Sequence, residues 1–458
     1  MSRLAIVILA AGQGTRVKSR RSKLLLELAG RPLVAYPLRL AESLDSAHLV
    51  LVLGHLADQV QEALGSGYTC VLQEPQLGTG HAVQQAQSVL EGQCDEVLVL
   101  YGDTPLLRRE TIAEMTRQHR AAGAVLTLLS GIVAEPHGYG RVVRDPAGRV
   151  QAVVEHADCT PDQRAIQEIN SGILLFQADW LWSHLPHIPR SPKGEYYLPH
   201  LIVQAVDEGQ PVVAYPAPDP DEIMGINDRL QLAEATAIIG RRILERHMRA
   251  GVTIVDPATT YVDDGVEIAQ DAIIRPNTHL LGQTRIGADC EIGPNAIVVD
   301  TVIGDRCQVL ASVLESATME DDVDIGPFGH LRKGAHLCAH VHMGNFGEVK
   351  NSRLGPGVKM GHFSYVGDAD IGEETNIGAG TITCNFDVHG RKNRTVVGKR
   401  AYIGSDTMLV APVELGDESV TGAGAVVTRD VPAGGVAYGV PARLKKTLEE
   451  IRGQEEEK

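Results

Sequence analysis

The sequence predicts a Rossmann-like, doubly wound α/β domain over residues 1–229, a linker helix over 230–250 and a parallel β-helix over 251–446. Three observations predict this order. Apolar runs of strand length alternate with helical stretches through the first half, as in a doubly wound sheet. Apolar residues at helical spacing then lead to a glycine, which marks the end of a connecting helix. Beyond it the apolar period changes to six, the spacing of the hexapeptide repeats that build a parallel β-helix.

The composition limits the classes of ligand. The chain has 458 residues, too many for one hydrophobic core, and a formal net charge of −16. This acidic balance argues against nucleic acid as a bulk partner, so local cationic groups must hold any anionic ligand. With 48 glycines and only 4% aromatic residues, the chain suits an architecture of small residues and tight turns.

The sequence gives no sign of export or membrane insertion. The N-terminus leads directly into a strand rather than a signal peptide, and no apolar run approaches the ~18 residues of a membrane span. The seven cysteines form no C-x-x-C pair, so neither a zinc site nor a disulfide framework is expected. These observations predict a cytoplasmic protein with free thiols and no membrane span.

The first strand, Leu4–Ala10, is an unbroken apolar run, which is typical of a central strand covered on both faces. In such sheets a ligand binds at the loop after the strand's carboxyl end. Here Gly12 and Gly14 let backbone N–H groups approach phosphate oxygens, and Arg16 and Lys23 add positive charge. Neither a P-loop nor a dinucleotide fingerprint is complete. The loop alone predicts a phosphate site or a structural turn.

Polar residues near other strand ends are further candidates. Gly78-Thr79-Gly80 opens a predicted helix whose N-terminal N–H groups can bind a ligand. Gln73, just before it, can read a base edge with its amide or can be a solvated loop residue. Asp103 follows a buried strand and can neutralise the loop or hold Mg²⁺, and Asn227 offers an amide oxygen as a second metal ligand.

The first half resembles a known enzyme family over its whole length. LAAGQGTR with Lys23, QLGTGHA with Gln73, YGD, GYGR, VEH, EINSGI and GIND follow one another in the order found in the sugar-1-phosphate nucleotidylyltransferases. The similarity is to the uridylyltransferase domain of the bacterial bifunctional enzymes that make UDP-N-acetylglucosamine. One position differs, because Ser22 stands where that family usually has proline before the lysine.

The resemblance implies UTP and N-acetylglucosamine 1-phosphate as substrates, with Arg16 and Lys23 as catalytic residues on the phosphates. It places Mg²⁺ on Asp103 and Asn227. The substrate-binding residues that it implies are Leu9, Ala10, Ala11, Gly12, Lys23, Gln73, Gly78, Thr79, Tyr101, Gly102, Gly140, Glu155, Asn170 and Asn227.

The second half repeats an aliphatic residue at every sixth position, with slips of register, and glycine often follows it, as in Ile286-Gly287 and Ile292-Gly293. Each short strand of a parallel β-helix points one aliphatic residue inward, and the glycine region turns a corner. The family resemblance implies that the helix is left-handed and that three chains form a homotrimer. A purely structural solenoid remains the alternative from the repeat alone.

Polar residues interrupt the repeat between Gly344 and Thr383, where Lys350, His362, Tyr365 and Asn376 occur together. This stretch resembles the acetyltransferase domain of the same bifunctional family, in which the histidine of the G-H-x-x-Y motif is the general base. The resemblance therefore implies that His362 is catalytic.

The same resemblance assigns the remaining groups of this half. Arg332 and Lys350 are expected to hold the sugar phosphate of glucosamine 1-phosphate, and Tyr365 and Asn376 its hydroxyls and amine. The acetyl-CoA residues that it implies are Ala379, Asn385, Phe386, Ser405 and Ala423. Phe386 replaces a tyrosine common in the family, and Asp387–Thr395 is one residue longer than usual. Residues 447–458 are expected to be a charged tail.

The expected function has two steps: acetylation of glucosamine 1-phosphate by acetyl-CoA, then transfer of UMP from UTP to the product with release of pyrophosphate. Such an enzyme supplies a precursor of peptidoglycan and lipopolysaccharide. Two alternatives stay open on the sequence alone. One is a single-activity sugar-1-phosphate nucleotidylyltransferase with a structural β-helix, and the other is a non-catalytic sensor or scaffold.

Overall fold

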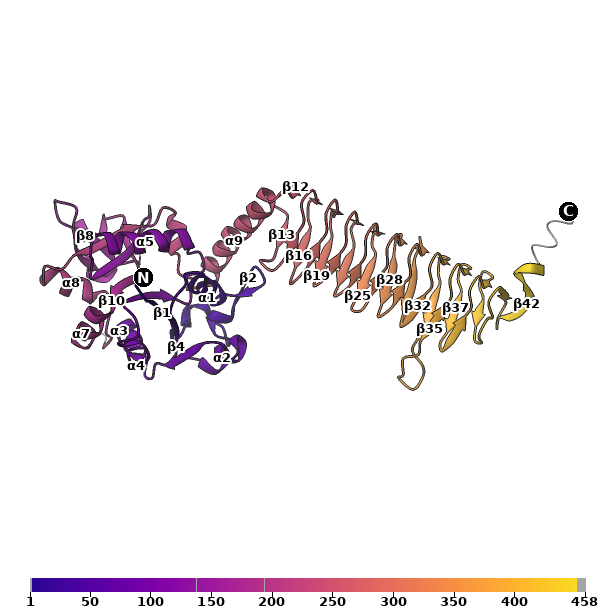
Figure 1. Cartoon of the computed structure of the whole chain (residues 1–458), viewed down its shortest axis with the longest axis horizontal. Helices are drawn as coiled ribbons and strands as arrows, with labels where there is room; N and C mark the ends of the chain where they lie inside the picture. The colour runs from indigo at the N-terminus through magenta and orange to yellow at the C-terminus, as the bar shows by residue number, and fades with distance from the viewer. Residues whose placement is uncertain (1, 137, 193, 451–458) are drawn as a thin grey trace. The chain divides into compact units, whose positions relative to one another are not determined.

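The computed structural model describes residues 2–136, 138–192 and 194–450 (Figure 1). The chain forms two compact units, Met1–Ile239 and Gly240–Lys458. The expected charged tail over 447–458 lies outside the described residues from position 451 onward. In the described part of the chain, no helix combines the length and the apolar character that crossing a membrane requires.

The first unit is an α/β domain around one large sheet. Its strands follow the order β11-β7-β10-β6-β1-β4-β5, with the β8–β9 hairpin attached beside β10. Their bounds are β1 Leu4–Ala10, β4 His48–Leu53, β5 Thr69–Leu72, β6 Glu96–Tyr101, β7 Leu126–Ile132, β8 Arg141–Arg144, β9 Val150–Val154, β10 Glu168–Gln177 and β11 Val212–Pro216. A small ribbon of β2 (Glu27–Leu28) and β3 (Arg31–Pro32) stands apart from this sheet.

Helices cover this sheet, as the purple ribbons in Figure 1 show. Their bounds are α1 Ala35–Glu42, α2 Ala57–Leu64, α3 Thr79–Gln85, α4 Gln87–Leu90, α5 Arg109–Ala121, α6 Pro161–Arg164, α7 Ala178–His184 and α8 His200–Asp207. The 21-residue helix α9 (Arg229–Arg249) occupies the segment expected to connect the two halves.

Strand β1 lies at the centre of the sheet, as its apolar sequence predicts. It pairs in parallel with β4 on one side and β6 on the other, and all seven of its residues are buried. Alternate side chains enter different cores: Val7 packs in one apolar cluster, and Ile6 and Ile8 pack in the other. Both faces of β1 are therefore covered, and its carboxyl end opens toward the loop at residues 11–16.

Strand β10 departs from the parallel order expected of a doubly wound sheet. It runs antiparallel to both of its neighbours, β6 and β7. The chain reaches β10 from the β8–β9 hairpin, so it enters the sheet from the opposite end. This reversal brings Asn170 and Gly172 to the edge of the sheet where β6 ends at Tyr101.

The second unit is a left-handed parallel β-helix of hexapeptide repeats (Figure 1). In the described residues its strands are two to five residues long and form three long sheets of 12, 10 and 9 strands, and each coil from β12 to β38 contributes one strand to each sheet. The strands that carry the candidate residues are β25 His330–Arg332, β26 His336–Leu337, β28 Gly347–Lys350, β30 Lys359–Met360, β31 Ser364–Gly367, β33 Asn376–Ile377, β34 Ile382–Cys384, β36 Tyr402–Ile403 and β39 Val420–Thr421.

The register of the coils explains the slips in the sequence period. In one sheet Ile274 pairs with Ile292, Ile292 with Val309 and Val309 with Ile325, so successive coils use 18, 17 and 16 residues. These aliphatic side chains are buried in the helix interior. The corners restrict which residue can occupy them. A Cβ on Gly287 would lie 2.5 Å from the backbone of Gly304 in the next coil. Only glycine fits where the backbones of neighbouring coils stack this closely.

Candidate active sites

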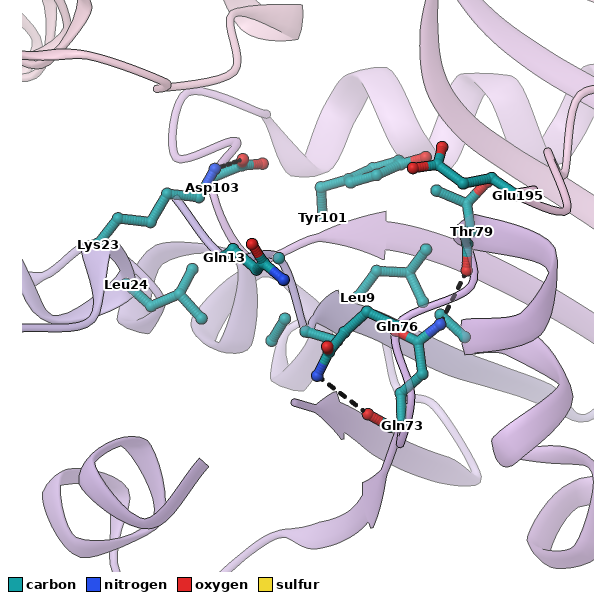
Figure 2. A pocket seen from close by; sticks show the side chains of 15 residues that line it. Leu9, Gln13, Lys23, Leu24, Gln73, Gln76, Thr79, Tyr101, Asp103 and Glu195 are labelled. Carbon is teal, nitrogen blue, oxygen red and sulfur yellow. Dashed lines mark hydrogen bonds and ion pairs between the residues drawn. The ribbon is translucent and has the colours of Figure 1, made fainter. Parts of the chain in front are cut away.

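A cavity of about 410 Å³ lies at the carboxyl end of β1 in the first unit (Figure 2). It is lined by Leu9, Ala10, Ala11, Gly12, Gln13, Lys23, Leu24, Gln73, Gln76, Gly78, Thr79, Ala82, Tyr101, Asp103 and Glu195. Ten of these are predicted site residues. The sheet therefore brings together motifs that lie up to about two hundred residues apart in sequence, as expected for a ligand site at strand ends.

Lys23 and Asp103 form an ion pair at the edge of this cavity (Figure 2), with side chains only 11% and 17% exposed. The Lys23 ammonium also lies 3.4 Å from the carbonyl oxygen of Ile226. Gly14 has a φ of +61°, and a Cβ there would lie 3.1 Å from the Lys23 side chain. Gly14 thus gives the loop its left-handed turn and leaves room for the lysine stem.

Asn227 lies next to Asp103, as the metal prediction requires. The Ile226 N–H donates to the Asp103 carbonyl at 2.9 Å, and Arg16 donates to the Asn227 side-chain oxygen at 2.8 Å. A carboxylate and an amide oxygen are ligands that suit a hard divalent cation. The residues present therefore fit a metal, and the side chains of Lys23 and Arg16 contact the oxygens of Asp103 and Asn227.

Gln73 is buried, so its interpretation as a solvated loop residue is wrong. Its amide nitrogen donates to the Gly78 carbonyl at 2.9 Å and lies 3.1 Å from His81 Nδ1. These contacts fix the amide against the start of α3, with the group facing the cavity (Figure 2). A fixed amide can discriminate between hydrogen-bonding edges, whereas a mobile one cannot.

Tyr101 links the cavity to a second group of predicted residues. Burial, together with the nearby charges of Asp103 and Glu155, raises the pKa of the Tyr101 phenol, so it stays neutral. Its ring packs on Gly172, where a Cβ would lie 2.7 Å from the ring. The Gly172 N–H in turn donates to the Asn170 side-chain oxygen at 2.9 Å.

Gly140, Glu155 and Asn170 lie together beside this tyrosine. The Asn170 N–H donates to the Gly140 carbonyl at 2.9 Å, and a Cβ on Gly140 would lie 3.5 Å from a Glu155 carboxylate oxygen. These three residues do not line the cavity itself, and neither do Arg16, Gly102 and Asn227. The predicted set therefore divides into cavity residues and residues on its rim.

The sequence analysis missed five cavity residues: Gln13, Leu24, Gln76, Ala82 and Glu195. Gln13, Gln76 and Ala82 lie within motifs that were already recognised, so the signal was present. Glu195 belongs to the polar and aromatic sequence GEYY before α8, which was not weighed.

In the second unit, the predicted phosphate residues stack on one sheet. Arg332 of β25 pairs in register with Lys350 of β28. The charge of Arg332, followed by that of Lys392, lowers the pKa of the Lys350 ammonium. Arg332 also donates to Glu348 at 2.8 Å, which leaves an excess of positive charge at this point. Such a cluster suits a phosphate group.

Tyr365 and Asn385 meet in a buried polar network on the next coils. Asp368 accepts hydrogen bonds from the amides of Asn385 and Asn351, each at 2.5 Å. The Asn385 amide lies 3.5 Å from the Tyr365 hydroxyl. A Cβ on Gly367 would lie 2.2 Å from this hydroxyl, so the phenol lies directly over the glycine.

His362 shares one corner of the β-helix with three predicted acetyl-CoA residues. It follows Met360-Gly361, and the equivalent positions after Ile377-Gly378, Ile403-Gly404 and Thr421-Gly422 are Ala379, Ser405 and Ala423. Strands β30, β33, β36 and β39 pair in this order, so these positions stack along the corner. His362 is exposed there.

Asn376 and Phe386 are placed differently from the corner residues. Asn376 belongs to β33, the strand that leads into that corner, and lies on a different sheet from Tyr365. Phe386 is 67% exposed on the loop between β34 and β35 (Thr395–Val397), which leaves the coil (Figure 1).

Comparison with known proteins agrees with both domains. A family model described as MobA-like NTP transferase domain matches residues 6–171. Another, described as hexapeptide repeat of succinyl-transferase, matches residues 283–313 and 394–429. The fold and these matches thus define a transferase that joins a nucleotidyltransferase domain to a hexapeptide-repeat acyltransferase domain.

Relatives identify the family more closely. The chain is 46% identical to "Bifunctional protein GlmU" of Pelobacter propionicus, over 95% of this chain and 96% of the relative. It is 44% identical to the protein of the same name in Geobacter sulfurreducens, over 100% of both chains. A third, from Brevibacillus brevis, is 41% identical over 97% of both. The chain belongs to the bifunctional GlmU family, which confirms the resemblance.

Proposed function

We propose that this chain makes UDP-N-acetylglucosamine from glucosamine 1-phosphate in two steps at two sites. The chain is a bifunctional acetyltransferase and uridylyltransferase of its family, and the single-activity alternative is not favoured. The observation that carries the proposal is the co-occurrence of two built sites: the cavity around Lys23 and Asp103, and the corner that carries His362. Both activities serve bacterial cell wall synthesis, through precursors of peptidoglycan and lipopolysaccharide.

We assign the first step to the β-helix, residues 251–446. His362 takes a proton from the amine of glucosamine 1-phosphate, and the amine attacks the thioester carbonyl of acetyl-CoA, which releases the thiol of coenzyme A. Arg332 and Lys350 hold the sugar phosphate, because their charges lie side by side. Tyr365 and Asn376 bind the sugar hydroxyls and amine. Acetyl-CoA lies along Ala379, Asn385, Phe386, Ser405 and Ala423.

We assign the second step to residues 1–229, with 230–250 as linker and 447–458 as tail. A phosphate oxygen of N-acetylglucosamine 1-phosphate attacks the α-phosphorus of UTP, and pyrophosphate leaves. The nucleophile is already an anion, so no general base is needed. Arg16 and Lys23 turn from Asn227 and Asp103 to the phosphates as these bind. Gly140, Glu155 and Asn170 select the acetylated sugar, and Gln73 reads the base.

The family implies a divalent metal, and we propose Mg²⁺ held by Asp103 and Asn227. The metal supplies charge neutralisation at the phosphates. The support from this chain is the pair of oxygen ligands joined by the Ile226 N–H contact to Asp103.

We further propose a homotrimer in the cytoplasm. Phe328 and Phe346 stack at 5.1 Å on the outside of the β-helix, where each is more than half exposed, and exposed Phe363 adjoins His362. Exposed aromatic groups in a row favour burial against another chain. All seven cysteines are free, which fits a reducing compartment.

The test uses the intact chain with glucosamine 1-phosphate, acetyl-CoA, UTP and Mg²⁺, and it follows free thiol and pyrophosphate separately. Thiol release is expected without UTP, and pyrophosphate release is expected to require acetyl-CoA or pre-acetylated sugar. Absence of thiol release would reduce the β-helix to a scaffold. Equal pyrophosphate release from unacetylated sugar would contradict the assigned order.

A further inference from the structure

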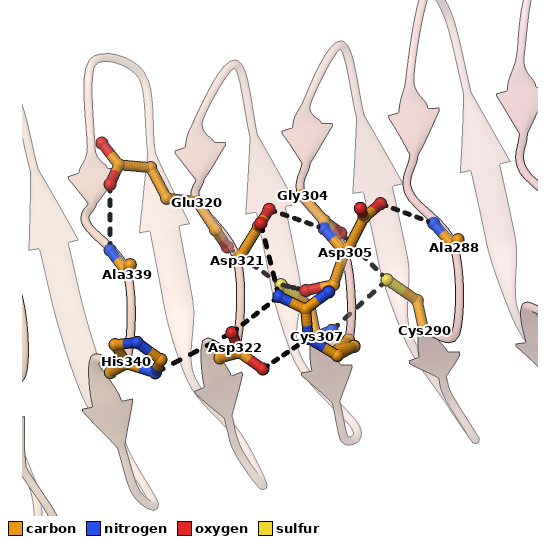
Figure 3. Close-up of polar contacts among 11 residues, drawn as sticks. Ala288, Cys290, Gly304, Asp305, Cys307, Glu320, Asp321, Asp322, Ala339 and His340 are labelled. Atoms are coloured by element: carbon orange, nitrogen blue, oxygen red, sulfur yellow. Dashed lines mark hydrogen bonds and ion pairs between the residues drawn. The ribbon is translucent and has the colours of Figure 1, made fainter.

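A corner of the β-helix away from the His362 corner carries a ladder of carboxylates that cross from coil to coil (Figure 3). Asp305 accepts from the Ala288 N–H at 2.8 Å, and Asp321 accepts from the Asp305 N–H at 2.9 Å. At the next coil Ala339 stands in the place of the aspartate, and its N–H donates back to Glu320, the residue before Asp321, at 3.0 Å. The longer side chain of Glu320 leaves the second carboxylate oxygen directed at two other side chains.

Those side chains are His336 and Cys338. His336 Nε2 lies 2.8 Å from Glu320 Oε1. The ligand atoms of Glu320, His336 and Cys338 all lie within 4.8 Å of one another. A tetrahedral zinc site, with bonds of about 2.0–2.3 Å, holds its ligand atoms roughly 3.2–3.8 Å apart, so only a small closure separates this cluster from such a site.

From this geometry we propose that Glu320, His336 and Cys338 bind one Zn²⁺ ion, which joins two successive coils of the β-helix. A thiolate, an imidazole and a carboxylate are the ligand types that zinc uses, and a fourth position is left for water. This site is separate from the oxygen-only pair Asp103 and Asn227, whose hard ligands favour Mg²⁺.

The surroundings supply the orientation and the access that a metal site needs. The Ala339 N–H holds the other oxygen of Glu320, as an outer hydrogen bond does for a ligating carboxylate. Cys338 is buried, whereas the His336 and Glu320 side chains are 39% and 43% exposed. The ion can therefore reach the site from solvent past His336 and Glu320, and buried Cys338 and the Ala339 N–H lie on the protein side.

Burial and a neighbouring charge have opposite effects on the pKa of the Cys338 thiol. Burial raises the pKa of the Cys338 thiol, and the Arg353 guanidinium opposes part of that rise. Asp321 and Asp322, which follow Glu320 in the chain, are ion-paired with Arg306 of the preceding coil.

The sequence did not indicate this site because its ligands follow no short motif. Glu320 and His336 are 16 residues apart in sequence and lie on successive coils, where Thr318 pairs with His336, so only the stacking of coils brings them together. The absence of a C-x-x-C pair excluded only the zinc sites that are local in sequence.

The test titrates the full chain with Co²⁺, whose bond to a thiolate gives a near-ultraviolet charge-transfer band that oxygen ligands do not give. We expect one thiolate-bound Co²⁺ per chain, displaced by Zn²⁺. Cys338→Ser should abolish the band, and Glu320→Gln and His336→Gln should each weaken binding at least tenfold. The last two variants change half-exposed side chains, so they leave the fold intact.

Cys384→Ser, at another cysteine of the same β-helix, is the matched control and should leave the band unchanged. Two results would overturn the proposal. One is the absence of any thiolate band in the intact chain. The other is a band that persists in Cys338→Ser, which would assign the metal to the stacked thiols of Cys290 and Cys307.

Discussion

The two units build their sites from the same chain in opposite ways. In the first unit a sheet collects distant motifs around one cavity, so that Arg16 contacts Asn227, 211 residues away. In the second unit four candidate residues, His362, Ala379, Ser405 and Ala423, repeat along one corner on successive coils. The first site depends on one group of charged and polar side chains around a single cavity, whereas the residues of the second site lie on several stacked coils. Removing one phosphate-binding cation should therefore cost more at the first site than at the second.

The largest effect is expected for Lys23→Ala. It removes the cation paired with Asp103 and the charge that we assign to the phosphates. Loss of such a group in a partly buried site typically reduces kcat by about 10²–10³. Pyrophosphate release should fall by that factor, and thiol release should not change. Arg20→Ala, at an exposed position of the same segment, is the control. An equal loss in both assays would contradict the separation of the two sites.

Lys350→Ala should have the next largest effect. The pKa of this lysine shows that the charges of Arg332 and Lys392 already act on it, so removing it leaves part of the positive cluster in place. We expect KM for glucosamine 1-phosphate to rise about tenfold, with a smaller change in kcat. The KM of the intact chain should rise with salt more steeply than that of the variant. A matching loss in Lys359→Ala would argue against a specific phosphate site.

Gly367→Ala tests whether the position of the Tyr365 phenol matters. The new Cβ would lie 2.2 Å from the phenol oxygen, so the ring must move. We expect acetyl transfer to fall about fivefold to tenfold, a cost of roughly 1 kcal/mol, within the range for a forced side-chain shift. In a Tyr365→Ala background the same substitution should have almost no further effect. Additive losses in the double variant would show that Gly367 acts on the coil and not on Tyr365.

The smallest effect concerns the core of the first unit. His119 is buried, and burial lowers its pKa below that of the unfolded chain. The unfolded state therefore binds more protons below about pH 6.5, and the free energy of unfolding should decrease as the pH falls from there. His119→Asn, which can keep the contact to Thr127, should flatten this dependence.

Urea unfolding at pH 7 and pH 5 measures this change. Trp180 and Trp182 are the only tryptophans and both lie in the first unit, so their fluorescence reports that unit alone. If the free energy of unfolding changes with pH as much in the variant as in the intact chain, groups other than His119 cause the pH dependence.

The sequence predicted both architectures because each leaves a local signal. The unbroken run of β1 and the six-residue period follow directly from burial on two faces and from one inward residue per short strand. The reversed strand β10 left no such signal, because its direction depends on where the preceding hairpin lies and not on its own residues.

Some residues of the candidate sites were predictable from the sequence and others were not. Motif residues such as Asp103 and Gln73 reach the cavity as expected. Glu195 was missed because it reaches the cavity only through the folding of a distant loop. Likewise, the network of Asp368 with Asn351 and Asn385 depends on contacts between coils, which no short motif records.

The central claim is that one chain carries two independent active sites, and paired single variants test it most directly. Thiol release and pyrophosphate release should be measured side by side in Asp103→Asn and in His362→Ala. The account predicts that Asp103→Asn loses pyrophosphate release but keeps thiol release, and that His362→Ala, given acetylated sugar, shows the reverse. Loss of both activities in either variant, with the fold intact, would contradict it.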